Sequence, residues 1–263
     1  MVSQSVNNPV IIGNAELWLG DCREILPTLP DNSAHMVMMD PPYGHNNNDD
    51  DLIRRREAAL GKISEKAEAR PIQNDGPEAN DLFRWTLPEL HRILASNGCC
   101  CCCCCCGGGG PDPQFARWSL WMDEVFNFKQ MVVWDKGPIG MGWHYRRSYE
   151  TVLVAEKKGG SRWFDESGKI ENIIRPGQYG IKKIIPQASD HPTPKPPELA
   201  ALFIRLHTLP GETIIDPFMG AGWSGVAAVR DQRKFIGIEI EERYFNIACE
   251  RIDQAQRQGK LFA

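Results

Sequence analysis

Residues 34–44 read AHMVMMDPPYG, a short apolar run that ends in an acid, two prolines and a tyrosine. An apolar run of this length that stops at a turn is typical of a strand covered on both faces. Proline fixes its own φ and keeps the preceding residue out of the helical region, so DPPY forms a stiff bend at the carboxyl end of that strand. Ligands of open α/β sheets bind at this end of the strands. The stretch therefore predicts a buried strand and a candidate site, with a plain surface turn as the alternative.

The rest of the chain alternates apolar runs with segments of helical periodicity. Further strands are predicted at residues 99–106, 130–134, 151–155, 213–215 and 235–240. Helices are predicted at residues 78–94, 115–126, 197–206, 222–230 and 241–256. This alternation is the signature of βαβ units, so we expect an α/β fold with a mostly parallel, twisted sheet and helices on both of its faces.

Composition limits the class of protein. The chain has 263 residues, 42% of them hydrophobic, and is long enough for one sizeable core, so we expect a single domain over residues 1–263. Outside residues 99–106, cysteine occurs only at positions 22 and 249, which does not fit a spaced disulfide framework. No apolar run reaches the roughly 18 residues of a membrane span, and no N-terminal targeting pattern is present. We therefore expect a cytoplasmic protein without a membrane partner.

Charge is unevenly distributed along the chain. The formal net charge is −4, but residues 129–183 hold eleven Lys and Arg against six Asp and Glu. A basic sector of this kind suits a polyanion, although it can equally be a solvated face.

Two stretches look like additions to the sheet. Residues 44–76 are polar and dense in charge, as in a mobile loop or a flap that faces the substrate, and residues 161–190 show little periodicity.

A second motif lies at residues 213–222, which read TIIDPFMGAG. A predicted strand ends in Asp216, a tight loop with Gly220 and Gly222 follows, and a helix starts next. Glycine lets a backbone approach a ligand closely, and a helix N-terminus favours negative charge. Glu239 ends the next predicted strand, where an acid commonly accepts hydrogen bonds from ribose hydroxyls. The fuller G-x-G-x-x-G pattern is missing, so a nucleoside that carries an amino acid fits better than a dinucleotide.

Taken together, DPPY, DPFMGAG, GIEIEERYFNIACERI and the intervening HPTPKP resemble the S-adenosylmethionine-dependent DNA amino-methyltransferases, which produce N6-methyladenine or N4-methylcytosine. The resemblance extends from GDCREILPTLPDNSAHMVMMDPPYG to the last helix. DPPY precedes the glycine loop, as in the permuted subgroup often called beta, which keeps target recognition between the two motifs. The resemblance implies a Rossmann-like methyltransferase fold, S-adenosylmethionine as cofactor and double-stranded DNA as partner. It also implies a small inserted target-recognition and DNA-contacting region, at residues 135–190.

The resemblance assigns roles to residues by position. The catalytic residues would be Asp40, Pro41, Pro42 and Tyr43. The residues lining the cofactor would be Asp21, His191, Thr193, Lys195, Asp216, Phe218, Gly220, Gly222 and Glu239. By the same resemblance, Glu239 would take the ribose hydroxyls, Asp21 would lie near the adenine, and HPTPKP would close over the methionine end. The chain departs from the family pattern at Pro194, where glutamine is common, and at Trp223 and Ser224, which replace a small residue and a threonine.

The expected chemistry follows from the bend. An exocyclic amine is a poor nucleophile because its lone pair is delocalised into the ring. Hydrogen bonds from the amine to the Asp40 carboxylate and the Pro41 carbonyl would favour a tetrahedral nitrogen, and Asp40 would stabilise the positive charge that develops on it. The base must leave the duplex, and Tyr43 would stack on it.

The target is expected to be the N6 amine of adenine. Aspartate at the first position of DPPY favours adenine, whereas family members that act on the N4 amine of cytosine, the main alternative, more often carry serine there. A methyltransferase for RNA or protein with a similar Pro-Pro-Tyr loop is a further alternative, but such relatives usually carry the two motifs in the reverse order.

For contacts with DNA the sequence offers Lys136, His144, Arg146 and Arg147, in the glycine-punctuated segment WDKGPIGMGWHYRRSYE. Adjacent arginines suit phosphates or guanine edges. An exposed hairpin with solvated charges is the alternative. The sequence leaves open the recognised DNA site, whether the protein is a homodimer, and whether a restriction endonuclease accompanies it in a restriction-modification system.

Residues 99–110 read CCCCCCCCGGGG. Same-face neighbours of a strand lie about 6.6 Å apart, whereas sulfurs that share a zinc ion at about 2.3 Å each must lie under about 4 Å from one another. On this ground we expect no metal, and a cysteine-based metal or redox protein is the remaining alternative class. Free cysteine behaves as a small buried hydrophobe, so the run is predicted to be a central strand. Residues 107–110 would then fall on the rim that carries DPPY, where side chains could obstruct a base or the cofactor.

Overall fold

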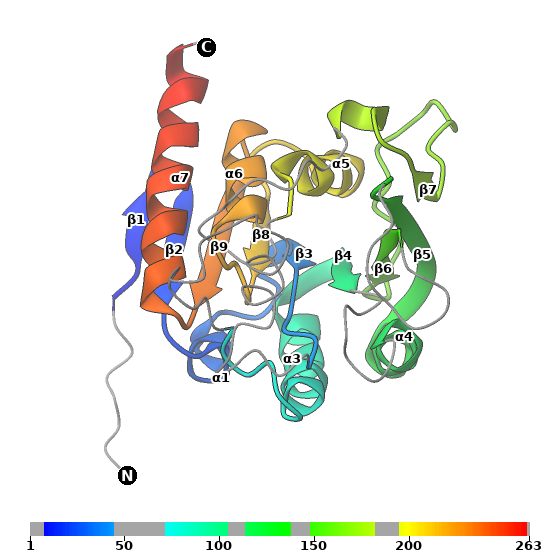
Figure 1. Ribbon diagram of the computed structural model, residues 1–263, viewed down its shortest axis with the longest axis horizontal. Helices are drawn as coiled ribbons and strands as arrows, with labels where there is room; N and C mark the ends of the chain where they lie inside the picture. Colours follow the sequence, from blue (N-terminus) through cyan, green and yellow to red (C-terminus); the bar gives the residue numbers. More distant parts are fainter. Residues whose placement is uncertain (1–7, 45–71, 105–113, 138–147, 182–194, 262–263) are drawn as a thin grey trace, which may run out of the picture.

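The computed structural model describes residues 8–44, 72–104, 114–137, 148–181 and 195–261. Strands of these residues form one nine-stranded sheet in the order β1-β2-β9-β8-β3-β4-β6-β5-β7 (Figure 1). The strands are β1 (Val10–Ile12), β2 (Ala15–Leu19), β3 (Ala34–Met39), β4 (Leu94–Cys104), β5 (Asn127–Asp135), β6 (Tyr149–Glu156), β7 (Ile173–Ile174), β8 (Thr213–Asp216) and β9 (Lys234–Glu239). The α-helices are α1 (Cys22–Ile25), α3 (Ala79–Ile93), α4 (Gln114–Val125), α5 (Pro197–His207), α6 (Trp223–Arg230) and α7 (Glu242–Leu261), and short 3-10 helices cover Leu26–Thr28 and Gln178–Gly180.

The centre of the sheet is parallel. β3 pairs in parallel with β4 on one side and with β8 on the other, and β9 and β2 continue the parallel run beyond β8. β6 is antiparallel to both β4 and β5, and β1 is antiparallel to β2 at the far edge. The expected mostly parallel sheet is confirmed. As a result, the carboxyl ends of β2, β9, β8, β3 and β4 meet at one rim.

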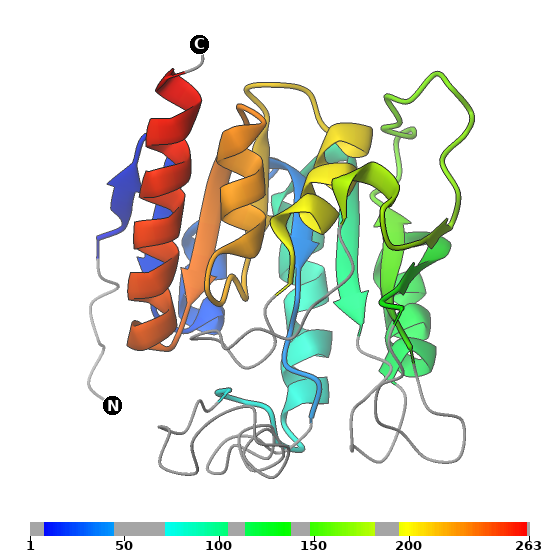
Figure 2. The same cartoon turned by 45° about the horizontal axis from the view of Figure 1, so that its top comes forward.

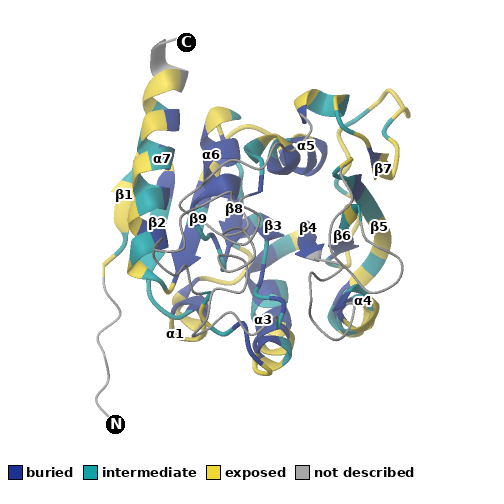
Figure 3. Ribbon diagram, in the orientation of Figure 1, coloured by how far each residue is buried: buried dark blue, intermediate teal, exposed yellow. Residues whose placement is uncertain are grey.

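Helices cover both faces of the sheet (Figures 1 and 2). α5, α6 and α7 pack on one face, where Phe203 and Val226 belong to the core. α1, α3 and α4 pack on the other face, where Leu87 and Trp118 belong to a second core. Buried residues accordingly follow the sheet and the inner sides of the helices (Figure 3). Among the described helices, none combines the length and the apolar character that crossing a bilayer requires.

All of the predicted strands and helices are present, with bounds shifted by a few residues. The elements that the sequence did not predict are short: β1, α1, β7 and the two 3-10 helices. β2 was missed as well, because its sequence AELWL places a charged residue within an apolar pattern. Elements of two to five residues give too few positions for a period to be recognised.

The cysteine run forms most of the central strand β4, as predicted. Each of Cys99 to Cys103 is at most 2% exposed. Cys99, Cys101 and Cys103 face the core under α5, α6 and α7, whereas Cys100 and Cys102 face the opposite core. Residues 105–113, including the four glycines, lie outside the described residues, so their predicted place at the rim stays a prediction.

β4 also corrects two expectations. The strand begins at Leu94, directly after α3, and not at residue 99, and its first part, residues 95–98, is irregular, with Asn97 at φ 65° and a shift of register opposite β3. The sulfurs of Cys99 and Cys101 lie 3.5 Å apart. Side chains on one face of a strand can lean toward each other, so the spacing argument against a shared metal ion was wrong.

Close packing of α6 on α7 depends on Gly222, the residue that precedes α6. Its φ is +78°, a left-handed conformation that favours glycine. A Cβ atom at this position would lie 3.0 Å from the Cβ of Ala248 on α7. Gly222 was predicted to line the cofactor, but its described neighbours show a contact between two helices.

Replacing Gly222 by alanine is expected to lower the free energy of unfolding by about 1–3 kcal/mol, because the new Cβ is strained by the backbone and crowds α7. Urea unfolding of both proteins measures the change. Gly211→Ala is a matched control, since Gly211 has a φ of +84° and an added methyl group there would meet nothing within 4 Å among the described residues. Equal losses in the two variants would show that contact with Ala248 contributes nothing.

Candidate active site

The rim of the sheet carries a cavity with about 1040 Å³ of empty space, partly open to solvent. Its walls come from the segments that follow β2, β3 and β8 and from the end of β9. Nine of the residues predicted for catalysis or cofactor binding line it: Asp21, Asp40, Pro41, Pro42, Tyr43, Lys195, Phe218, Gly220 and Glu239. The two motifs, about 170 residues apart in the chain, therefore face one cavity.

The remaining predicted cofactor residues are placed differently. Asp216 is fully buried behind the glycine loop and does not line the cavity. Gly222 contacts α7, as described above. His191 and Thr193 lie outside the described residues.

Asp40 is held by two neighbours at the end of β3. The Lys195 ammonium donates to Asp40 Oδ2 at 2.8 Å, and the Tyr43 hydroxyl donates to Oδ1. Lys195 also donates to the Tyr43 hydroxyl oxygen at 3.1 Å. Burial raises the pKa of Asp40, and the adjacent ammonium of Lys195 opposes that rise. Lys195 was predicted to contact the cofactor; it lines the cavity, and its described contacts include the proposed catalytic acid.

Glu150, in β6, joins this cluster although the sequence did not single it out. Its Oε2 lies 3.3 Å from Lys195 Nζ, and its Oε1 accepts from Lys136 Nζ at 2.6 Å. Burial would raise the pKa of Glu150, but the two ammonium groups outweigh it and hold the pKa at about 2. The charges alternate in the order Lys136, Glu150, Lys195, Asp40, so each buried charge has an opposite neighbour. The sequence signal that could have identified Glu150 is an acid at the start of an otherwise apolar strand.

Two further residues that the sequence analysis missed fix the DPPY bend. The carboxylate of Asp75, itself 1% exposed, accepts from the backbone N–H groups of Tyr43 and Gly44, both at 2.9 Å. The side-chain amide of Gln114 donates to the Tyr43 carbonyl at 3.0 Å. Residues 72–75 line the cavity, so the described end of the polar insert 44–76 faces the site, whereas residues 45–71 lie outside the described part of the chain.

The glycine loop is ordered by two buried acids. Asp216 accepts from the N–H of Phe218 at 3.0 Å and from the hydroxyl of Ser224. Glu239 accepts from the N–H groups of Gly220 and Glu241, both at 2.8 Å. Burial raises the pKa of Asp216 to about 8 and that of Glu239 to about 7. Both carboxyl groups thus change protonation near neutral pH.

Trp223 adds an unsatisfied donor to the wall of the cavity. Its indole Nε1 is buried and has no hydrogen-bond partner among the described residues. A buried N–H without a partner is unfavourable, so a donor in this position favours a polar ligand group. The departure from the family pattern at position 223 therefore places a buried donor, without a partner among the described residues, in a side chain that lines the cavity.

The predicted DNA contacts are largely outside the described residues, since His144, Arg146 and Arg147 fall in the gap 138–147. Lys136 is described and pairs with Glu150. Other cations of the basic sector also have partners within the protein, as Arg162 pairs with Glu212 and Lys157 donates to the Leu94 carbonyl at 2.6 Å. Part of the positive charge of the basic sector is therefore engaged in ion pairs and hydrogen bonds within the protein.

Comparisons with known proteins agree with this geometry. Residues 34–250 match the model of the N6_N4_Mtase family, described as DNA methylase. The chain is 25% identical over 266 residues to the DNA adenine methyltransferase YhdJ of Escherichia coli K12, which covers 90% of this chain and 82% of YhdJ. It is 33% identical over 142 residues to the type II methyltransferase M2.DpnII of Streptococcus pneumoniae, across 49% of this chain and 53% of that protein.

Solved structures share the fold. TTHA0409 of Thermus thermophilus, in complex with S-adenosyl-L-methionine, superposes with a TM-score of 0.63 at 22% identity, over 91% of this chain and 95% of that one. The cytosine-N4-specific PvuII DNA methyltransferase superposes with a TM-score of 0.66 at 19% identity, over 97% of this chain and 96% of that one. The Rossmann-like methyltransferase fold expected from the motifs is thereby confirmed. With most of its length matched by the family model, the chain belongs to the N6/N4 DNA methylase family, whose methyl donor is S-adenosylmethionine.

Proposed function

We propose that the protein methylates the N6 amine of adenine in double-stranded DNA at a specific sequence. The observation that carries the proposal is the cavity in which the Asp40 carboxylate faces the same space as the glycine loop and Glu239. Adenine as the target is supported by Asp40 at the first position of DPPY and by similarity to YhdJ, a DNA adenine methyltransferase. Cytosine N4 is the second candidate, because the PvuII enzyme with that specificity has the same fold.

The cavity fits S-adenosylmethionine by the chemistry of its walls. Glu239 offers a carboxylate for the ribose hydroxyls, and Asp21 offers one near the adenine. Trp223, whose Nε1–H has no partner among the described residues, stands in the same walls, and such a donor would suit an anionic group such as the carboxylate of the methionine end. Phe218 and Tyr244 supply apolar surface in the same walls. When bound, the cofactor supplies an electrophilic methyl group on a sulfonium.

Asp40 performs the central step in this proposal. The target amine donates a hydrogen bond to the Asp40 carboxylate, taking the place that the Tyr43 hydroxyl occupies on Oδ1. The hydrogen bond favours a nitrogen whose lone pair is directed at the methyl group, and the carboxylate stabilises the positive charge on nitrogen during transfer. Lys195 holds the other oxygen and keeps the carboxylate in place.

In this proposal, Tyr43 holds the target base in the cavity after the base has left the duplex. The amine cannot be reached inside a duplex, so the base must swing out, at a cost of a few kcal/mol in unstacking. Stacking of the Tyr43 ring on the base returns about 1–3 kcal/mol. Tyr43 is 8% exposed and lines the cavity, and the centroid of its ring lies 6.0 Å from that of the Trp118 ring.

Incubating the protein with labelled S-adenosylmethionine and unmethylated DNA, followed by digestion to nucleosides, tests the proposal. Label in N6-methyladenine is the expected result. Label in N4-methylcytosine alone would overturn the adenine assignment and leave the family chemistry intact. Transfer to RNA or to a polypeptide, with none to DNA, would overturn the DNA substrate as well.

Cofactor affinity is expected to rise roughly tenfold between about pH 6 and about pH 8, because the pKa of Glu239 is near 7 and its ionised form accepts the ribose hydroxyls. Below the pKa the protonated carboxyl is a poorer acceptor, so binding releases a proton. Titration calorimetry in buffers of different ionisation enthalpy measures both effects. Glu239→Gln should bind more weakly and lose the pH dependence. The same dependence in that variant would mean that another group, such as Asp216, is responsible.

A further inference from the structure

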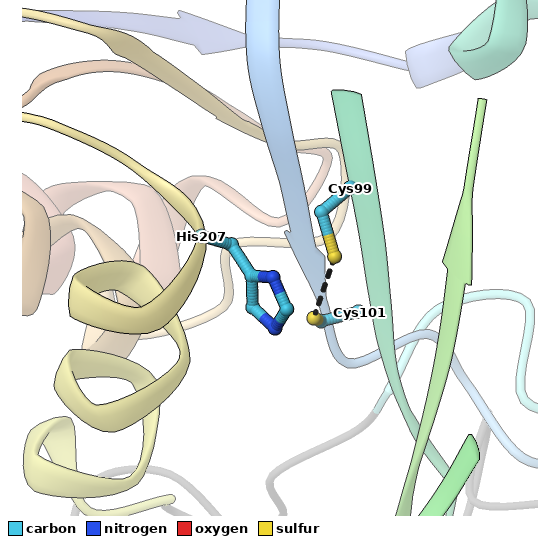
Figure 4. Close-up of side chains that lie close together, drawn as sticks. All are labelled: Cys99, Cys101 and His207. Atoms are coloured by element: carbon cyan, nitrogen blue, oxygen red, sulfur yellow. Dashed lines mark hydrogen bonds between the residues drawn. The ribbon is translucent and has the colours of Figure 1, made fainter. Parts of the chain in front are cut away.

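Three potential metal ligands meet on the sheet face that is covered by α5. Cys99 and Cys101 project from the same face of β4 toward His207, the last residue of α5 (Figure 4). Their sulfurs lie 3.5 Å apart, and the ligand atoms of all three residues lie within 4.8 Å of one another. Both cysteines are 0% exposed and His207 is 4% exposed. The family chemistry described above uses none of these groups.

The hydrogen bond of the His207 imidazole favours the tautomer that a metal ligand requires. Its Nδ1 lies 2.7 Å from the carbonyl oxygen of Arg162, and a carbonyl only accepts, so Nδ1 carries the hydrogen. In the neutral ring Nε2 is therefore the nitrogen without a hydrogen, the one that can bind a metal ion. Metal-binding histidines commonly donate their other ring N–H to a backbone carbonyl in this way, which fixes both tautomer and ring orientation.

We infer that Cys99, Cys101 and His207 bind one zinc ion. Thiolates and imidazole are the ligands that zinc prefers, and monovalent copper is the main competitor for two sulfurs. Two thiolates, a neutral imidazole and a divalent ion sum to zero charge, whereas the same ligands with monovalent copper leave a net negative charge. Because the site is buried and an uncompensated buried charge is unfavourable, the neutral combination is preferred.

The ligand spacing is close to that of a tetrahedral site. With zinc–sulfur bonds of about 2.3 Å the sulfurs should be about 3.8 Å apart, against the 3.5 Å observed. The sulfur–nitrogen separation in such a site is about 3.5 Å, so each sulfur–nitrogen separation has to shorten by about 1.3 Å at the most from the 4.8 Å limit. Rotation about the side-chain bonds of the two cysteines and His207 is the movement that would bring the ligands together.

A second cavity adjoins His207 and would supply the fourth ligand. Its space of about 870 Å³ is partly open to solvent and is lined by His207, Glu156 and Ser161 among others. The Glu156 carboxylate is already engaged, since Oε1 accepts from Ser161 at 2.6 Å and Oε2 lies 3.5 Å from Lys129 Nζ. A water molecule from this cavity would therefore complete the tetrahedron. The zinc ion would tie β4 to the end of α5 that is remote from Lys195 and the rim.

Metal binding by the full-length protein tests the inference directly. Protein freed of metal with a chelator is titrated with Zn²⁺, and a second sample with Co²⁺ as a spectroscopic probe. The expected result is one ion per chain, a thiolate-to-cobalt charge-transfer band, and an X-ray absorption spectrum of the zinc form with two sulfur neighbours and one imidazole nitrogen. Failure to bind Zn²⁺ in a chelator competition, or a shell without sulfur, would overturn the inference.

Variants on the two faces of β4 locate the site. Cys99→Ser, Cys101→Ser and His207→Gln should each weaken Zn²⁺ binding by more than about a hundredfold, since loss of a direct ligand exceeds the 10–100-fold effect of an outer-shell change. Cys100→Ser and Cys102→Ser make the same substitution at equally buried positions that face the other core, so they should retain binding. Equal losses on both faces, or full binding by Cys99→Ser, would contradict the assignment. The absorption spectrum of the wild type decides the matter even if a variant fails to fold.

Discussion

Asp40→Ala is expected to reduce the rate of methyl transfer to DNA by about a hundredfold to a thousandfold or more, on the scale of removing one group that stabilises charge in a transition state. Asp40 is the carboxylate that would accept the target amine, and it is held in place by the Tyr43 hydroxyl on Oδ1 and by the Lys195 ammonium on Oδ2. The measurement is transfer of labelled methyl groups to DNA under single-turnover conditions.

Cofactor binding by Asp40→Ala should remain close to that of the wild type, because Glu239 and the glycine loop belong to another part of the cavity wall and keep their contacts. Asp81→Ala, at an exposed position in the first turn of α3, is the control for loss of an acid and should leave turnover unchanged. Retained turnover in Asp40→Ala would remove Asp40 from the role given to it. Loss of both binding and turnover would point to a folding defect instead.

The fold could be predicted because its main strands are continuous apolar runs. β3, β8 and β9 each end in an acid or run into a turn with proline or glycine, which fixes both the strand and its carboxyl end. The same local signals identified Asp40 and Glu239. Their meeting in one cavity followed from the rule that parallel strands present their carboxyl ends at a common rim.

The partners of those acids could not be predicted, because they come from distant parts of the chain and carry no local pattern. Lys195 is 155 residues from Asp40, and Asp75 holds the bend from 31 and 32 residues away. Glu150 lies within a sector whose net positive charge suggested contacts with DNA rather than a buried ion pair. Such pairings depend on the register between β4 and β6 and on where the start of α5 lies relative to the rim of the sheet. A single sequence reveals neither.

The cysteine strand shows a different limit of prediction. Its burial followed from the apolar character of cysteine, and the structure confirms it for residues 99–103. The separation of its sulfurs did not follow from the strand repeat, because the repeat describes the backbone and the χ1 angles place the sulfurs. His207 comes from another element, so no spacing within the run could have indicated a third ligand.

Lys195→Met is expected to lower the free energy of unfolding by about 3–5 kcal/mol at pH 7, since it leaves buried carboxylates without their shared counter-ion. For a chain of this size that corresponds to a fall in Tm of roughly 10 °C. The 4% exposure of the Lys195 side chain means that solvent cannot replace the lost ammonium. Urea and thermal unfolding measure the change.

The same variant should alter the pH dependence of catalysis, which a purely structural role would not do. Burial already raises the pKa of Asp40, and the Lys195 ammonium is the main group that opposes the rise. Without it the pKa of Asp40 rises further, so the ionised form needed to accept the amine is lost at a higher pH. The acid limb of kcat/KM should therefore move to more alkaline pH.

Lys136→Met is the matched control, because it removes an ammonium from the same chain of charges. The Lys136 side chain is 33% exposed, so the effect of this variant on the free energy of unfolding should be about 1 kcal/mol or less. Equal stability of the two variants, with an unmoved acid limb in Lys195→Met, would show that Lys195 does not set the charge state of Asp40.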